Sequence, residues 1–152
     1  MANVADRADV QGGVVVGHDG SEPAARATRW AARLAVLLDV PLHVVRAWSL
    51  TSAPRPKTAA PGYVPPITDF EQAVREQLEA HVAGLDLPEA CQVNCHVVHA
   101  APARALLQAA ERAELLVVAA RGTGGFRGLM FGSTADQVTR HAPCAVTIVP
   151  AG

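Results

Sequence analysis

The sequence is poor in cysteine, and charge of neither sign dominates it. Its three cysteines cannot all pair with one another, which argues against a disulfide framework. Cys91 and Cys95 lie four residues apart on an expected strand, but no further ligands lie near them, so we interpret them and Cys144 as small buried side chains. The net charge is −1 and no block of like charge occurs, which argues against nucleic acid or an acidic membrane surface as a partner.

The sequence also lacks an apolar run of the roughly 20 residues that span a bilayer. Residues 1–11 carry Asp6, Arg7 and Asp9 where a signal peptide would be apolar, so we expect a flexible leader and a cytoplasmic protein. Half of the 152 residues are hydrophobic, which is enough for one substantial core. The sequence therefore predicts a single domain over residues 12–152.

Short apolar runs alternate with helical patterns along the chain. The runs predict strands at residues 13–18, 42–48, 91–99, 115–119 and 145–149. The helical patterns lie between these runs, at residues 21–38, 68–84, 102–113 and from 134 onward. Strands that alternate with helices in this way predict an α/β fold, a parallel sheet of five strands with helices on both faces.

The helix starts carry sequence signals of their own. Ser21 is expected to cap the first helix, with Pro23 in the first turn where its missing N–H does no harm. Thr68 and Thr134 each begin a match to the capping box, with an acidic or amide residue three positions later. Five prolines make residues 51–66 a loop.

A glycine-rich segment from Val117 to Ser133 connects an expected strand to an expected helix. Such a connection presents backbone N–H groups to an anion, and glycine allows close approach of a phosphate. Arg121 and Arg127 add positive charge. Alternatively, the glycines only turn the chain and Arg121 is simply solvated. The glycines of the segment are Gly122, Gly124, Gly125, Gly128 and Gly132.

The glycine pattern fits neither common phosphate-binding motif. Gly132-Ser133 lacks the lysine of a P-loop, and Arg127 stands where the dinucleotide fingerprint needs a third glycine. Asp19 directly follows the first strand, so if the first and fourth strands are neighbours, Asp19 and Gly122 flank one crevice of the kind where α/β sheets bind ligands. Asp19 is equally well explained as a turn former whose carboxylate accepts hydrogen bonds from nearby N–H groups.

Four segments are more specific than the glycine count: 14–21 (VVVGHDGS), 45–48 (VRAW), 97–102 (VVHAAP) and 141–144 (HAPC). Through them the chain resembles the universal stress protein family over residues 14–150. The nucleotide-binding branch of that family is marked by Gly, two residues, Gly, nine residues, Gly and then Ser or Thr. Gly122, Gly132 and Ser133 match this motif, whereas Ala119 replaces its first glycine. Ala100 is a second departure, because the family often has glycine there.

The resemblance implies a homodimer, paired through the last strands, that holds ATP or AMP, with or without Mg²⁺, and is not a strong catalyst. It places Asp19 and Ala47 around the adenine and ribose, Ala119 near the ribose, and Gly122, Gly132, Ser133 and Thr134 around the phosphates. Ser133 and Thr134 are also expected to cap the last helix. In the proline-rich loop, Arg55 and Lys57 are candidates to close over the nucleotide.

Two functions of different classes fit the sequence. The first is a nucleotide-binding regulator of the stress response that passes its occupancy to an unknown protein partner. The second is an interaction protein of the same fold whose nucleotide site is vestigial. An ATP-hydrolysing enzyme would need a base and a magnesium ligand, and Asp19 is the one candidate for both roles.

Overall fold

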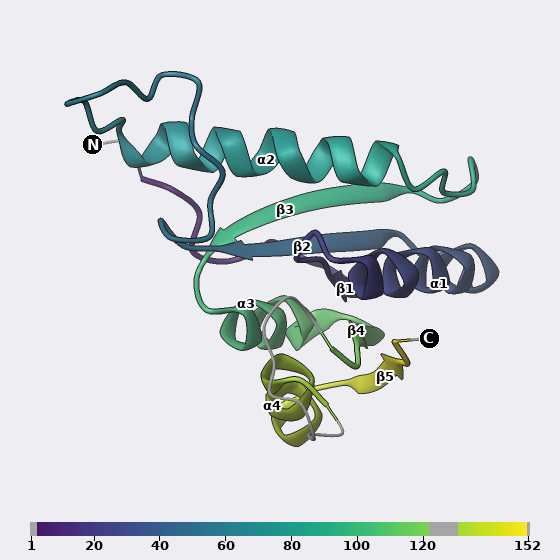
Figure 1. The fold of residues 1–152 in the computed structure, drawn as a ribbon. Coiled ribbons are helices and arrows are strands. Elements are labelled where there is room, and N and C mark those ends of the chain that lie inside the picture. Colours follow the sequence, from purple (N-terminus) through teal and green to yellow (C-terminus); the bar gives the residue numbers. More distant parts are fainter. Residues whose placement is uncertain (1–2, 122–130, 152) are drawn as a thin grey trace.

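The computed structural model describes residues 3–121 and 131–151. Its centre is a sheet of five parallel strands in the order β3-β2-β1-β4-β5 (Figure 1). This confirms the predicted α/β fold with a parallel sheet. The strands are β1 (Val14–Gly17), β2 (Leu42–Trp48), β3 (Val93–His99), β4 (Leu115–Ala119) and β5 (Ala145–Val149).

Two helices cover each face of the sheet, giving three layers (Figure 1). On one face lie α1 (Glu22–Leu38) and α2 (Ile67–Ala83). On the other lie α3 (Pro102–Ala109), continued by the 3-10 turn η1 (Ala110–Arg112), and α4 (Ser133–His141). None of the described helices combines the length and the apolar character needed to cross a membrane.

The strand order reverses at β1, which pairs with β2 on one side and β4 on the other. In open α/β sheets a crevice forms at such a point, beyond the carboxyl ends of the strands. Asp19 follows β1, and the glycine-rich segment follows β4. The first and fourth strands are neighbours, so the condition under which Asp19 and the segment after β4 flank one crevice is met.

The helix caps differ from the sequence prediction at two of three places. Ser21 caps α1 as predicted, because its Oγ accepts a hydrogen bond from the Ala24 N–H at 3.2 Å. The Thr68 prediction is wrong, since α2 already begins at Ile67 and its N-cap is Pro66. The Thr134 prediction is also wrong, since Gly132 holds the extended N-cap conformation of α4. In both cases the helix starts ahead of the threonine, which lies inside its first turn.

The cysteines pack as small side chains. Strand β3 starts at Val93, so Cys91 lies outside it, in a turn where its N–H donates to the Pro88 carbonyl at 2.9 Å. Cys91 and Cys95 are nevertheless half-buried against the same core, on the α1–α2 face. Cys144 packs against the core of the opposite face.

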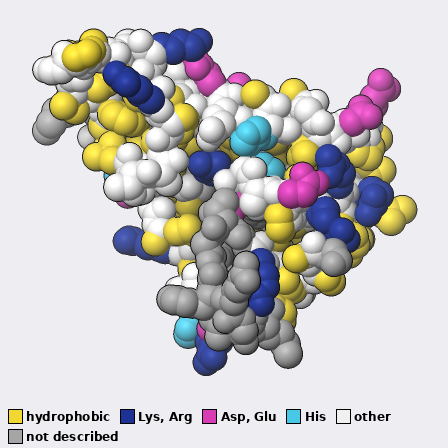
Figure 2. Space-filling view, in the orientation of Figure 1, with side chains coloured by type: hydrophobic (Ala, Val, Ile, Leu, Met, Phe, Trp, Pro, Cys, Tyr) yellow, Lys and Arg dark blue, Asp and Glu magenta, His cyan; other side chains and the backbone are white. Residues whose placement is uncertain are grey.

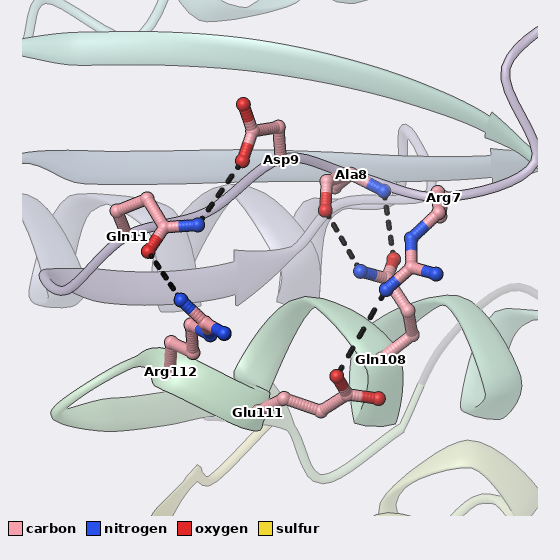
Figure 3. Close-up of polar contacts among 7 residues, drawn as sticks. All are labelled: Arg7, Ala8, Asp9, Gln11, Gln108, Glu111 and Arg112. Carbon is pink, nitrogen blue, oxygen red and sulfur yellow. Dashed lines mark hydrogen bonds and ion pairs between the residues drawn. The ribbon is translucent and has the colours of Figure 1, made fainter.

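The N-terminal residues differ from the predicted flexible leader. Ala8 and Val10 are buried, and both backbone groups of Ala8 pair with the side-chain amide of Gln108 on α3, at 2.7 and 2.8 Å (Figure 3). Farther along, the Gly12 N–H donates to the Arg112 carbonyl at 2.8 Å. The segment therefore packs as part of the domain, because Ala8 and Val10 bury their side chains in the core on the α3–α4 face of the sheet.

Candidate functional site

A cavity of about 280 Å³, here called the β1–β4 cavity, lies at the carboxyl ends of β1, β2 and β4. Helix α3 forms one wall, and the start of α4 forms another. Its described lining residues are Gly17, His18, Asp19, Ala24, Val45, Ala47, Pro102, Leu106, Val118, Ala119, Ser133 and Thr134. Five residues predicted from the sequence, in four separate segments, thus meet at one place: Asp19, Ala47, Ala119, Ser133 and Thr134.

The floor of the cavity is apolar because Val45 and Ala47 of β2 and Val118 of β4 line it. Val45 and Val118 are buried, and Ala47 lies one period of two residues beyond Val45, on the same face of β2. Gly17 allows α3 to approach, since a Cβ there would lie 2.8 Å from Cδ1 of Leu106. Such a floor suits a flat aromatic or apolar group better than a charged one.

Asp19 forms the turn between β1 and α1. Its Oδ1 accepts hydrogen bonds from the N–H of Ser21 at 3.0 Å and from the Ser21 hydroxyl at 2.5 Å. Gly20 follows with φ of +88°, a conformation that favours glycine. The turn-forming role of Asp19 is therefore observed, and the same residue also lines the cavity.

The opposite rim is built where β4 meets α4. The Gly132 N–H donates to the Ala120 carbonyl at 2.7 Å, and this bond fixes the start of α4 against the end of β4. Ser133 and Thr134 then occupy the first two helical positions and face the cavity. Amide groups in the first turn of a helix have no partner inside the helix, and the helix dipole adds partial positive charge, so this rim suits an anion.

The remaining predicted residues fall in different places. Gly132 is buried beside the rim, and Arg121 is half-buried just after β4. Gly122 lies outside the described residues, as do the other loop glycines before Gly132 and Arg127. Arg55 and Lys57 do not line the β1–β4 cavity; they border a separate hollow beside α2, where Lys57 lies 3.9 Å from Glu76.

Sequence reasoning missed seven of the lining residues: Gly17, His18, Ala24, Val45, Pro102, Leu106 and Val118. The alternation of side chains along the strands was a usable signal for two of them. Val45 lies two residues before Ala47, and Gly17 lies two before Asp19. Leu106 had no such signal, because its place depends on how α3 packs over β1 and β2.

The charges beside Asp19 lie on the side of the sheet that α1 and α2 cover. Burial lowers the pKa of Arg46, while the Asp19 carboxylate raises it. Burial also lowers the pKa of His18, with His81 contributing in the same direction. The cavity is thus apolar on the α3 side and borders buried basic groups behind Asp19.

Known proteins match the chain along most of its length. The sequence profile of the Universal stress protein family matches residues 13–150. A universal stress protein of Mycobacterium tuberculosis is 35% identical over 137 residues, which cover 90% of this chain and 47% of that protein. A universal stress protein of Thermus aquaticus is 30% identical over 142 residues, covering 90% of this chain and 96% of that protein. The chain spans about half the length of the mycobacterial relatives it matches.

Solved structures share the fold. A universal stress protein in complex with cAMP aligns with a TM-score of 0.62 and 26% identity, over 93% of this chain and 98% of that chain. A universal stress protein of Archaeoglobus fulgidus in complex with dAMP has the same TM-score of 0.62 at 23% identity, over 92% of this chain and 98% of that chain. At that identity the second likeness shows the fold alone.

Proposed function

Since the chain belongs to the universal stress protein family, we propose that its β1–β4 cavity binds an adenine nucleotide, ATP or AMP. One observation carries the proposal: residues from four separate segments that the nucleotide-binding motif and its flanking strands single out all line the same cavity. The related structure that contains cAMP supports the same class of ligand.

The two sides of the cavity suit the two ends of such a nucleotide. The apolar floor at Val45, Ala47 and Val118 suits the adenine ring. The first turn of α4, with the hydroxyls of Ser133 and Thr134, suits the phosphates. Asp19 lies on the wall between the two and is held in place by its bonds to Ser21.

The proposed role is binding rather than strong catalysis. Asp19 is the one carboxylate among the described lining residues, and it already accepts two hydrogen bonds from Ser21, which weakens it as a base. We therefore assign any Mg²⁺ that accompanies ATP to the phosphates rather than to a set of protein ligands.

The proposal extends to a regulatory homodimer in the stress response. Within the described residues, β5 pairs with β4 alone, so the other edge of β5 is open to a second strand. Soluble proteins normally cover such an edge, and a second copy of the chain does so most simply. Three free thiols agree with a reducing compartment, the cytoplasm. The dimer would communicate the binding of nucleotide at α4 to a protein partner.

Ala119 supports a second candidate function, an interaction protein with a vestigial site. Ala119 lines the cavity at the position of the first motif glycine, near the expected ribose. If the methyl group excludes the ribose, the dimer surface and the loop at residues 51–66 carry the function instead.

Calorimetric titration of the nucleotide-stripped protein with ATP and AMP, with and without magnesium, tests the proposal. We expect micromolar binding to the unchanged protein. Thr134→Val should raise the Kd roughly tenfold, because it removes a hydroxyl at the phosphate end. Thr139→Val is the matched control, since that hydroxyl donates to the Ala135 carbonyl within α4. Equal Kd values for the two variants would contradict the phosphate assignment, and no heat at millimolar nucleotide would favour the vestigial site.

A further inference from the structure

A second cavity, here called the α1–α2 cleft, opens between the start of α1 and the end of α2. Its volume is about 270 Å³. In Figure 2, histidine, basic and acidic side chains come to the surface close together near the middle of the face. The cleft is lined by His18, Gly20, Ser21, Glu22, Ala25, Arg29, Ala80, His81, Gly84 and Leu85.

Strand alternation directs two basic side chains toward this side of the sheet. His18 follows Val16 by two residues, and Arg46 lies between Val44 and Trp48, all of which pack on the α1–α2 face. The His18 N–H donates to the Val45 carbonyl at 3.0 Å, which brings the end of β1 beside Arg46. Only 4% of His18 and 8% of Arg46 is exposed.

Arg46 is buried as a residue, and the Asp19 carboxylate is near enough to raise its pKa. Among the described residues, however, its guanidinium takes part in none of the ion pairs. A Cβ on Gly20 would lie 3.4 Å from Nη1 of Arg46 and 3.1 Å from Cε1 of His81. Gly20, at φ +88°, therefore leaves room where these two basic side chains converge.

Two imidazoles next to Arg46 have nitrogen atoms without a partner. In the described part of the chain, Nε2 of His18 and Nδ1 of His81 are buried and make no hydrogen bond. The rings are edge to face with their centroids 5.7 Å apart, and Nδ1 of His18 lies 3.3 Å from the Thr28 hydroxyl. Buried polar groups are normally hydrogen-bonded, so two such imidazole nitrogens beside the Arg46 guanidinium indicate a missing hydrogen-bond partner.

The acidic groups at the cleft leave the two imidazole nitrogens without a partner. Asp19 accepts hydrogen bonds from Ser21 and raises the pKa of Arg46, and Glu22, at the mouth, lies 3.7 Å from Arg29. The N-terminus of α1, which begins beside Gly20, adds partial positive charge. Burying a guanidinium and two imidazole nitrogens is unfavourable, and a bound anion would offset part of that cost.

We propose that the α1–α2 cleft is a second binding site, next to the nucleotide cavity with which it shares His18, for a small tetrahedral oxyanion held by His81 and by Arg46, whose Nη1 lies beside Gly20 of the cleft. Inorganic phosphate and the phosphate group of a small phosphomonoester share this chemistry. The guanidinium supplies two parallel N–H donors, and a protonated imidazole supplies a further charged donor. The site does not depend on Ala119 or on the residues at the start of α4.

Nuclear magnetic resonance of the imidazole side chains tests the proposal. The full chain is titrated at fixed pH with sodium phosphate, with β-glycerophosphate, and with sodium chloride at equal ionic strength. We expect the resonances of His81, which lines the cleft and not the β1–β4 cavity, to shift and saturate with phosphate but not with chloride. His18 should shift as well, but it lines both cavities and does not distinguish them. Saturation by β-glycerophosphate as well would identify phosphomonoesters as ligands, whereas its failure would restrict the site to the free ion.

Arg46→Met removes the charge while keeping an unbranched side chain. We expect it to weaken phosphate binding at least about tenfold. Arg33→Met, on the exposed side of α1, is the matched control and should bind as the unchanged protein does. His81→Gln, at a half-buried position, provides a second test if Arg46→Met does not fold. A His81 resonance that stays in place as phosphate is added would overturn the proposal, even if His18 or the amides of Ser133 and Thr134 shift.

Discussion

Ala119 is the residue on which nucleotide affinity depends most closely. It ends β4, it lines the β1–β4 cavity while its side chain packs against the core on the α1–α2 face, and it replaces the first glycine of the motif. Strand backbone accepts alanine without strain, so the methyl group acts through space rather than through conformation.

Ala119→Gly should therefore tighten AMP and ATP binding by a few-fold. The same change should destabilise the fold by about 0.5–1 kcal/mol, because glycine loses more backbone entropy on folding. Titration calorimetry and denaturant unfolding measure the two effects. An unchanged Kd, with the expected loss of stability, would mean that the methyl group does not meet the ligand.

A histidine pair makes the stability of the fold depend on pH. Nδ1 of His43 and Nε2 of His96 lie 2.9 Å apart. Burial and then His43 lower the pKa of His96 to about 4, and burial lowers that of His43. Arg75 adds to the effect on His96, while Asp9 opposes it at both rings.

Because both folded-state pKa values lie below 6.5, the unfolded chain binds more protons in acid. The stability from this pair is complete above pH 6.5 and is lost as the pH falls through about 4. We expect a loss of about 1–2 kcal/mol, less than the full shift because His96 is half-buried. Unfolding measured across this range should show a flatter acid limb for His96→Gln than for His141→Gln, an exposed control.

At the scale of elements, the Gln108 side chain makes two of the hydrogen bonds that hold the N-terminal segment beside α3 (Figure 3). The amide of Gln108 bonds both backbone groups of Ala8, whereas the Arg7–Glu111 contact at 4.0 Å is between exposed groups and contributes little. Gln108→Met should lower the free energy of unfolding by about 1–2 kcal/mol, since it leaves two backbone groups without partners. It should also speed proteolysis near residue 8.

Gln137→Met on the exposed side of α4 is the control for this change. If the two variants are equally stable and equally resistant to protease, the segment does not depend on Gln108 for its place.

The sequence predicted the strands and helices well because their signals are local. Strands β2, β4 and β5 have the predicted bounds, since each is a short, mostly apolar stretch of the sequence. The N-terminal segment was not predicted, because its bonds join residues about 100 positions apart. The capping boxes at Thr68 and Thr134 failed because a proline and a glycine just before them already had the extended backbone that an N-cap needs.

For the whole molecule, the candidate site was predictable where a motif coincides with a strand end or a helix start. Asp19, Ala47 and Ala119 lie at strand ends, Ser133 and Thr134 lie at the start of α4, and all five line one cavity. Leu106 and Pro102 reach the cavity only through the packing of α3, which no local pattern encodes. The cluster of His18, His81 and Arg46 escaped prediction for the same reason, since it joins β1, β2 and α2.

The open edge of β5 predicts the assembly of the molecule. Ala145 is exposed at the start of this strand, so Ala145→Lys places a charge where a second copy would pair. We expect the dimer Kd to rise about tenfold or more, as measured by analytical ultracentrifugation. Gln137→Lys adds the same charge on α4 and should leave the assembly unchanged. A dimer that survives Ala145→Lys unaltered would require a different interface.

The central claim is that the β1–β4 cavity binds an adenine nucleotide, and backbone amide resonances test it most directly. In a titration with AMP, the amides of Ala47, Ala119, Ser133 and Thr134 should shift together and saturate at micromolar ligand, while that of Lys57, outside the cavity, stays in place. If these four amides remain unmoved at millimolar AMP and ATP, the cavity does not bind nucleotide and the account is contradicted.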